Sequence, residues 1–328
     1  MRHAHAEDTG DDVAIDDQMA LLYPRQAPLA PAAGLQDARA VWASVPARLS
    51  PTVLVFLHGH NNYVSVDSKG QSRIPDWATT EAARAGAAGK PAAPLSYQLD
   101  KINLNTTGTS PLVLVPEDAV EAHNSFWATE PRGQYADPSR LGLLIAECQL
   151  RLARLHRPHH GSAYLPTPPM PLQRLCLSGH SGAGLPLQEA AGSHLASPDT
   201  GLPTDLWLFD CTYWSDIQNF VSFCARWRGA GRLTAGHVNS ARFVCVYRPQ
   251  TQTEAIADSL RREIAFVLGQ SPESLVVDHH PTAPETILLN ALRANAVLFV
   301  RTPTPHDSIP TEFIPRLLET AAAKRERE

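Results

Sequence analysis

The sequence predicts an α/β fold in which a mostly parallel central sheet carries helices on both faces. Short apolar, β-branched runs alternate with longer amphipathic stretches from about residue 39 to the carboxyl terminus. Several runs are nearly continuous in Val, Leu and Phe, as is typical of parallel strands buried on both faces. The chain has 328 residues, 43% of them hydrophobic, and is therefore long enough to bury such a core.

Seven segments have the length and composition of strands. The clearest are TVLVFLHG, QRLCLSG and ARFVCVY, in which apolar residues follow one another with few polar interruptions. Turn-forming residues bound most of the segments, which separates them from the helices. The predicted strands are 39–45, 52–59, 111–118, 173–179, 205–210, 241–247 and 295–301.

Helical stretches lie between and after these strands. In 139–155 and 253–269, apolar residues recur at the three- and four-residue spacing of an amphipathic helix. The proline-rich segment 156–173 is expected to be a surface loop. The predicted helices are 78–88, 139–155, 182–196, 214–227, 253–269 and 311–328.

The domain organisation follows from this alternation. Residues 1–18 contain six acidic groups and no periodic apolar pattern, so we expect a flexible acidic tail. Strands and helices alternate in the same way on both sides of the loop 156–173, so we expect a single domain over 19–328. The segments 61–77, 89–110 and 119–138 are irregular, and loops after strand ends are where ligands bind in such sheets.

Composition excludes several classes of function. The formal net charge of -5 offers no basic field for a nucleic acid. No apolar run approaches the 18 or so residues of a transmembrane segment, and the acidic amino terminus does not resemble a signal peptide. The five cysteines are odd in number and lack metal-ligand spacing, so we expect free thiols, a reducing compartment and a cytoplasmic location.

The segment RLCLSGHSGAG, residues 174–184, carries the most chemical information. A buried strand runs into Gly179-His180-Ser181-Gly182-Ala183-Gly184 and then into an amphipathic helix. This is the pattern of a nucleophile elbow, in which a serine on a tight strand-to-helix turn exposes its hydroxyl group. Small neighbours are needed because the two backbones approach closely there. Ala183 stands where glycine is commoner in the usual pentapeptide, which is a departure of one methyl group.

With a second motif, His58-Gly59-His60, after the strand 52–57, the chain resembles the α/β-hydrolase superfamily. That resemblance implies an α/β-hydrolase fold and acyl transfer without a cofactor. It also implies an oxyanion hole formed by the amides of His60 and Gly182, with Asn61 as the near alternative to His60. Such donors stabilise the charge that develops on the carbonyl oxygen in the transition state.

A serine nucleophile needs a histidine base and a carboxylate that orients it. In this superfamily the chain order is serine, acid, histidine. His306 lies in the loop after the last predicted strand, and no histidine follows it. We therefore expect Ser181 as the nucleophile and His306 as the base.

Two aspartates compete for the acid. Asp210 ends the strand DLWLFD, so its carboxylate should emerge at the same sheet edge as Ser181. The superfamily usually carries the acid one strand later, but the strand ARFVCVY is followed by Arg-Pro-Gln and offers no carboxylate. We favour Asp210 and keep Asp278, in SLVVDHH, as the alternative.

Aromatic and polar residues near predicted strand ends are candidates for an acyl or aromatic pocket. The paired histidines His279 and His280, and those at 156, 159 and 160, lack the spacing of a zinc site, so we interpret them as exposed loop residues and expect no metal. The predicted substrate-binding residues are Asn61, Tyr63, Trp127, His180, Tyr213 and Trp214.

These features together predict a serine hydrolase of the carboxylesterase or lipase-like kind, acting on a small-molecule ester or acyl substrate. Two alternatives remain open at this point. The same residues serve an acyltransferase or an amidase, in which the acceptor or the scissile bond differs. The scaffold also supports binding proteins without catalysis.

Overall fold

A computed structural model describes residues 13–14, 19–22, 41–44, 51–57, 65–66, 72–73, 111–116, 138–160, 171–213, 217–235, 237 and 239–322. The chain divides into two compact units, Met1–Leu172 and Gln173–Glu328, and each is described by itself. The single domain expected over 19–328 stays a prediction.

The first unit contains five strands in the order β1-β2-β3-β7-β4, in which β7 and β4 are parallel and the other neighbours are antiparallel. The short strands β5 and β6 form a separate antiparallel pair. Its elements are β1 (Val13–Ala14), β2 (Met19–Leu22), β3 (Val41–Ser44), β4 (Thr52–Leu57), β5 (Ser65–Val66), β6 (Ser72–Arg73), β7 (Leu112–Pro116) and α5 (Pro138–His160).

Three strands predicted in this unit are present as β3, β4 and β7. Helix α5 runs to His160, five residues into the segment 156–173 that the proline content marked as a loop. The strand β1 falls within the predicted acidic tail and pairs with β2. Residues 1–12 and the predicted helix 78–88 lie outside the described residues.

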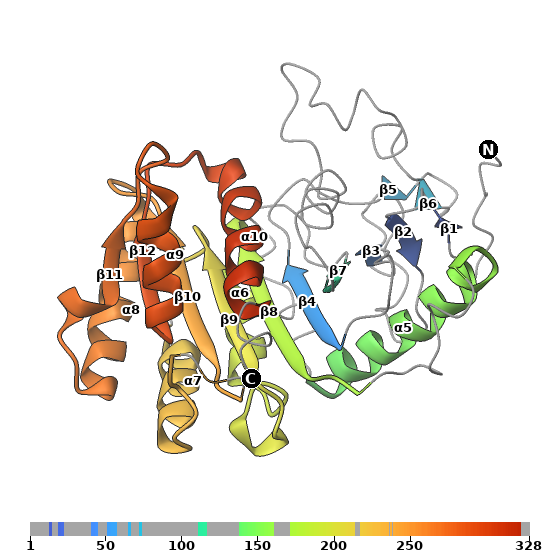
Figure 1. Ribbon diagram of the computed structural model, residues 1–328, viewed down its shortest axis with the longest axis horizontal. Helices are drawn as coiled ribbons and strands as arrows, with labels where there is room; N and C mark the ends of the chain where they lie inside the picture. Colours follow the sequence, from blue (N-terminus) through green and yellow to red (C-terminus); the bar gives the residue numbers. More distant parts are fainter. Residues whose placement is uncertain are drawn as a thin grey trace. The chain divides into compact units, whose positions relative to one another are not determined.

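The second unit contains five parallel strands with the order β8-β9-β10-β12-β11 (Figure 1). Its strands are β8 (Arg174–His180), β9 (Thr204–Phe209), β10 (Arg242–Tyr247), β11 (Val276–Asp278) and β12 (Val297–Arg301). Its helices and short 3-10 segments are η3 (Ser181–Ala183), α6 (Gly184–Gly192), η4 (Pro198–Thr200), α7 (Gln218–Gly229), α8 (Gln252–Leu268), η5 (Pro272–Leu275), α9 (Glu285–Ala294), η6 (His306–Ser308) and α10 (Ile309–Ala322).

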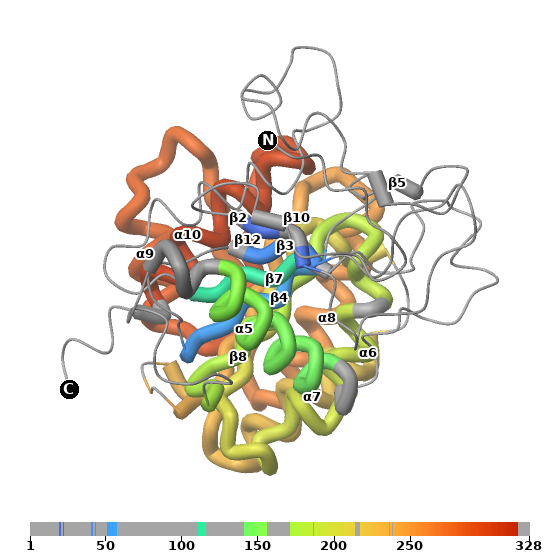
Figure 2. The backbone as a smooth tube through the Cα atoms, turned by 90° about the vertical axis from the view of Figure 1, so that its right-hand side faces the viewer, coloured from blue at the N-terminus to red at the C-terminus, as the bar shows by residue number. Residues whose placement is uncertain are grey.

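Helices cover both faces of this sheet. Figure 2 shows α9 and α10 on one side of the strands and α6, α7 and α8 on the other. Strand order explains the division, because crossovers between parallel strands are right-handed. The chain steps outward from β8 to β11 through α6, α7 and α8, then turns back through α9 to β12. The predicted fold class, a mostly parallel sheet with helices on both faces, is confirmed.

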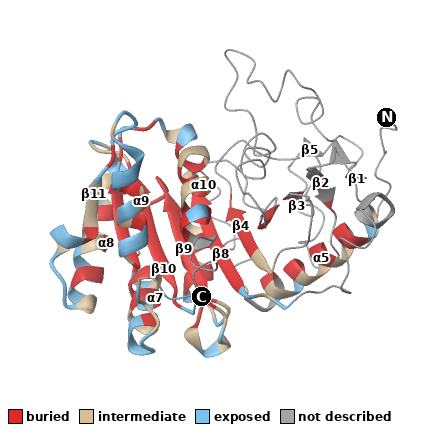
Figure 3. Ribbon diagram, in the orientation of Figure 1, coloured by how far each residue is buried: buried red, intermediate tan, exposed pale blue. Residues whose placement is uncertain are grey.

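The core lies along the central strands, where every residue of β8, β9 and β10 is buried (Figure 3). Burial on both faces explains why these segments are nearly continuous apolar runs. Phe243 on β10 packs against Phe299 on β12 and Phe220 on α7, with ring centroids 5.8 and 6.3 Å apart. All five cysteines are buried and free, as expected.

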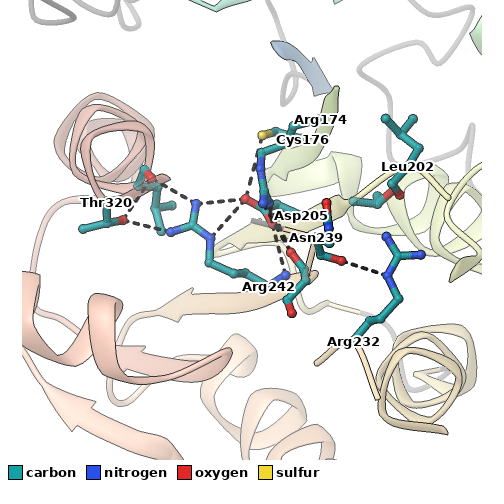
Figure 4. A network of polar contacts seen from close by, with 11 residues as sticks. Arg174, Cys176, Leu202, Asp205, Arg232, Asn239, Arg242 and Thr320 are labelled. Carbon is teal, nitrogen blue, oxygen red and sulfur yellow. Dashed lines mark hydrogen bonds and ion pairs between the residues drawn. The ribbon is translucent and has the colours of Figure 1, made fainter. Parts of the chain in front are cut away.

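A buried ionic network fixes the amino-terminal ends of three neighbouring strands (Figure 4). The carboxylate of Asp205, on β9, accepts from Arg174 at 2.6 Å and from Arg242 at 2.9 and 3.0 Å. Arg242 also donates to Thr320 Oγ1 and to the carbonyl of Leu317 on α10. The network therefore links β8, β9 and β10 to α10. It lies at the edge of the sheet where these strands begin, opposite the edge where they end.

Two elements of the second unit were not predicted. Strand β11 has only three residues, none of them buried, and its two valines form too short an apolar run to identify a strand. Helix α9 follows it.

None of the described helices has the length and apolar character to cross a membrane.

Candidate active site

The strand register brings four strand ends to one edge of the sheet in the second unit. His180 pairs with Phe209, and Phe209 with Val246. Tyr247 pairs with Arg301 one residue further on. The residues that directly follow these strands therefore emerge side by side, because parallel strands in register end at the same edge.

Ser181 begins the turn that follows β8. Its φ of 54° lies in the left-handed region, which is unusual for a residue with a side chain. His180 before it is extended, at φ -126° and ψ 143°, and Gly184 after the turn is helical. The chain thus reverses from strand to helix within one short 3-10 segment. This is the backbone geometry that a nucleophile elbow requires.

The positions around Ser181 differ in how strongly they require a small residue. A side chain on Gly184 would collide with the carbonyl oxygen of Cys211, so the backbones of α6 and the segment after β9 are in close contact there. A Cβ at Gly179 would lie 3.1 Å from Leu187 and 3.2 Å from the Ala183 carbonyl oxygen. The methyl group of Ala183 is itself buried and accommodated. Glycine is thus most strongly required at 184, one position after the usual pentapeptide.

His306 opens η6, after the short segment 302–305 that follows β12, and contacts Asp210. Its Nδ1 lies 2.7 Å from Asp210 Oδ2. The Asp210 side chain is fully buried, whereas 23% of the His306 side chain is exposed. Because a carboxylate only accepts, Nδ1 of His306 is the donor in this contact.

The carboxylate of Asp210 has three side-chain partners. Thr253, at the start of α8, donates to Oδ1 at 2.5 Å, and Arg248 Nε donates to Oδ2 at 2.5 Å, the oxygen that also faces His306. Burial alone would raise the pKa of Asp210, but the hydrogen bonds from His306, Thr253 and Arg248 outweigh it and lower the pKa to about 2. The carboxylate is therefore ionised throughout the neutral range.

The backbone at Asp210 is also unusual. Its φ is 44°, and its amide donates to the carbonyl oxygen of Val246 at 2.7 Å. The strand β9 thus makes one further hydrogen bond to β10 before the chain turns sharply. Ser181 and Asp210, at the ends of neighbouring strands, both have left-handed backbone conformations, and such outliers cluster at functional sites.

Asp278 has different surroundings. It accepts from Arg301 Nε at 2.6 Å and from a second guanidinium nitrogen at 3.1 Å. Its side chain is 71% exposed. The structure therefore pairs Asp210 with His306 and Asp278 with Arg301.

His180, a predicted substrate-binding residue, contacts His306. The two rings have centroids 4.3 Å apart and are tilted by 36°. Nε2 of His180 lies 3.0 Å from the carbonyl oxygen of His306. Only 8% of His180 is exposed. Burial, followed by the nearby charge of His306, lowers the pKa of His180 to about 3, so its ring is neutral at physiological pH.

Tyr213, a predicted substrate-binding residue, is partly buried near the same strand ends. Burial, together with the charge of Asp210, raises the pKa of Tyr213 to about 12. Gly182 is buried in η3. The remaining predicted site residues, His60, Asn61, Tyr63, Trp127 and Trp214, lie outside the described residues.

Sequence reasoning missed Arg248 and Thr253, which complete the surroundings of Asp210. Both lie just beyond β10. The sequence prediction considered this strand end only as a place for the acid and found no carboxylate there. The interpretation of His279 as exposed was wrong. It is 5% exposed, and its Nε2 lies 2.9 Å from Glu312 on α10. The backbone amide of His279 donates to the carbonyl oxygen of Arg301 on β12, and this hydrogen bond directs the His279 side chain inward.

Among the described residues, His180, His306 and Asp307 could together offer three ligand atoms to a metal, within 4.8 Å of one another. Nδ1 of His306 already faces Asp210, and Nε2 of His180 already faces a carbonyl oxygen. Since a ring nitrogen that carries a proton cannot ligate, each histidine has one nitrogen left.

No family model and no curated protein matches the chain. Solved structures similar to it include several esterases and a hormone-sensitive lipase. A feruloyl esterase module from Clostridium thermocellum has 10% identity and a TM-score of 0.40, over 98% of this chain and 93% of that one. Esterase B from Lactobacillus rhamnosis has 10% identity and a TM-score of 0.36, over 97% and 89%. An esterase of the bacterial hormone-sensitive lipase family has 13% identity and a TM-score of 0.38, over 87% and 81%. At these scores the likeness bears on neither activity nor substrate.

Proposed function

We propose that the protein is a serine hydrolase that cleaves carboxylic esters through an acyl-enzyme. Ser181 is the nucleophile, His306 the general base and acid, and Asp210 the orienting carboxylate. The amides of Gly182 and His60 form the oxyanion hole. None of these steps calls for a cofactor.

The contact between His306 Nδ1 and Asp210 Oδ2 carries the proposal. A serine hydroxyl becomes a useful nucleophile when an imidazole takes its proton, and the carboxylate selects the tautomer with a free Nε2. This pair lies at the same sheet edge as Ser181, whose backbone has the left-handed conformation of a sharp strand-to-helix turn. An isolated surface histidine would need neither a buried carboxylate nor this position.

The reaction follows from these groups. Ser181 Oγ attacks the ester carbonyl carbon while its proton passes to His306 Nε2. The tetrahedral intermediate then expels the alcohol, which takes that proton, and the acyl group stays on Ser181. Water attacks the acyl-enzyme with His306 again as base, and the acid and free enzyme are released.

Electrostatics favour this cycle at neutral pH. Asp210 is ionised because its pKa lies near 2, so its charge stabilises the imidazolium form of His306 that each proton transfer creates. The neutral ring of His180 beside it adds no opposing positive charge. The base is partly exposed, which leaves it accessible to substrate.

The test is labelling of the purified protein with a fluorophosphonate probe, with mass spectrometry to locate the adduct. An adduct on Ser181, absent in Ser181→Ala, is expected. Ser308→Ala is the matched control, because Ser308 is an exposed serine two residues from His306. An unlabelled Ser181 in folded protein that also fails to cleave p-nitrophenyl butyrate would overturn the proposal. Product analysis with added alcohols or amines separates hydrolysis from acyl transfer.

A further inference from the structure

The side chain directly before the proposed nucleophile supports the proposed base. His180 and His306 are 126 positions apart in the chain, yet their rings are in contact and a hydrogen bond joins them. His180 is the last residue of a fully buried strand, so its backbone is fixed by the sheet. His306 lies in a short segment between β12 and α10. The contact therefore links a rigid element to the loop that carries the base.

We propose that His180 is a positioning residue for His306: its Nε2 hydrogen holds the His306 carbonyl oxygen, and its ring packs against the His306 imidazole and keeps it facing Asp210. This role rests on the proposed function. It assigns His180 an action through the base, in place of the direct contact with substrate expected from the sequence.

The protonation state of His180 suits this role. A carbonyl oxygen only accepts, so Nε2 of His180 must carry a hydrogen for the 3.0 Å contact to be favourable. Burial keeps the ring neutral, since its pKa is lowered to about 3. A neutral donor holds the loop without placing a second cation beside the imidazolium that forms during turnover.

The rest of the loop is anchored from the opposite side. Thr304 donates to Glu312 Oε2 at 2.8 Å and shares a 2.8 Å hydrogen bond with Thr302. His279 binds the other oxygen of the same glutamate at 2.9 Å. Glu312 thus fixes the residues before His306 to α10, and His180 fixes His306 itself to β8. With the backbone held at these two points, only the His306 imidazole remains to be oriented, and it contacts Asp210.

Three substitutions separate the parts of this contact. His180→Gln keeps a donor, because the glutamine amide nitrogen lies where Nε2 does. His180→Phe keeps a ring and loses the donor. His180→Asn places its amide nitrogen near the position of Nδ1, too short to reach the carbonyl. Exposed His280→Gln is the control for loss of a histidine elsewhere.

The readouts are kcat and KM for p-nitrophenyl butyrate and the rate of fluorophosphonate labelling at Ser181. A misplaced base costs turnover, so His180→Phe and His180→Asn should lower kcat by about 10- to 100-fold and slow labelling in parallel. KM should stay within about twofold of the wild-type value, and His180→Gln should recover most of kcat.

Three results would overturn the inference. One is a loss confined to KM, which would indicate substrate contact. Another is unchanged kcat in His180→Phe, and the third is a His180→Gln variant as slow as His180→Asn. If His180→Phe does not fold, judged by its thermal transition, the comparison of Gln with Asn decides. Wild-type protein that neither labels at Ser181 nor cleaves the ester would instead sink the proposed function, whatever the variants do.

Discussion

Arg248 and His306 share one carboxylate oxygen: both approach Oδ2 of Asp210, at 2.5 and 2.7 Å. The Arg248 side chain comes from the end of β10, the strand after which an acid was sought and not found. Asp210, the proposed acid, therefore contacts a cation as well as the proposed base. The negative charge available to stabilise the imidazolium is reduced by this partner.

Arg248→Met should move the acid limb of the pH–rate profile to higher pH, because it removes a positive charge that shares Asp210 Oδ2 with His306. Without the guanidinium, the charge of Asp210 holds a proton on the imidazole more strongly, so more alkaline conditions are needed to free the base. The measurement is kcat/KM for p-nitrophenyl butyrate between pH 5 and 9. Arg301→Met, which removes an exposed guanidinium paired with Asp278, should leave the profile in place. A shift to lower pH would contradict the argument.

Asp210→Asn should lower kcat by about 10³- to 10⁴-fold, because asparagine no longer selects the productive tautomer of His306. Asp278→Asn is the matched substitution, and its turnover should stay near that of the wild type since its carboxylate faces Arg301. Steady-state kinetics on both variants, with circular dichroism as a check of folding, make the comparison. A larger loss in Asp278→Asn would move the acid to the later loop.

Parallel strands in register end at one edge of the sheet, and this explains how much of the candidate site could be predicted from the sequence. Ser181, Asp210 and His306 each follow a buried apolar run, and parallel strands in register bring such ends together. Partners that depend on side-chain reach could not be found this way. Arg248 and Thr253 are unremarkable by sequence, and they meet Asp210 only because the β9 and β10 registers align.

The burial of His279 has the same cause. Strand β11 is too short and too exposed to show an apolar pattern, so the sequence gives no sign that the next residue turns inward. Its position was set by pairing with β12 and by Glu312 on α10, both distant in the chain. Local patterns thus located the strands and their ends, whereas contacts among distant residues decided which neighbouring side chains are buried.

Ser181→Gly should be more stable than Ser181→Ala. An L-residue at positive φ is strained by about 1 to 2 kcal/mol, and glycine removes that strain at the cost of a more flexible unfolded chain. The expected net difference in the free energy of unfolding is about 0.5 to 1 kcal/mol, measured by urea denaturation. Both variants should be inactive, so the substitutions should differ in their effect on stability but not in their effect on turnover. Lower stability of the glycine variant would show that the turn is not strained at Ser181.

Asp205→Asn should destabilise the protein by about 3 to 5 kcal/mol, since it leaves two buried guanidinium groups without their carboxylate. Glu319→Gln is the control. It breaks an exposed ion pair with Arg293, and its expected cost is below about 1 kcal/mol. Urea unfolding of both variants at pH 7 measures the difference. Equal and small effects would mean that water or rearranged side chains satisfy Arg174 and Arg242.

The pH dependence of stability should report the buried state of His180. Its folded pKa of about 3 lies below the value near 6.5 expected for an unfolded chain, so the unfolded state binds the proton first. Stability therefore falls as pH drops through 6.5 and goes on falling until about 3. From pH 7 to 5 this single group should account for a loss of about 2 kcal/mol.

The comparison of wild type with His180→Gln isolates that loss, because glutamine keeps the donor and does not titrate. The difference between their free energies of unfolding should change by about 2 kcal/mol from pH 7 to pH 5, with the variant gaining relative to the wild type as pH falls. His280→Gln, at an exposed histidine, should show no such trend. A difference independent of pH would mean that the folded protein protonates His180 as easily as the unfolded chain does, which its burial against His306 opposes.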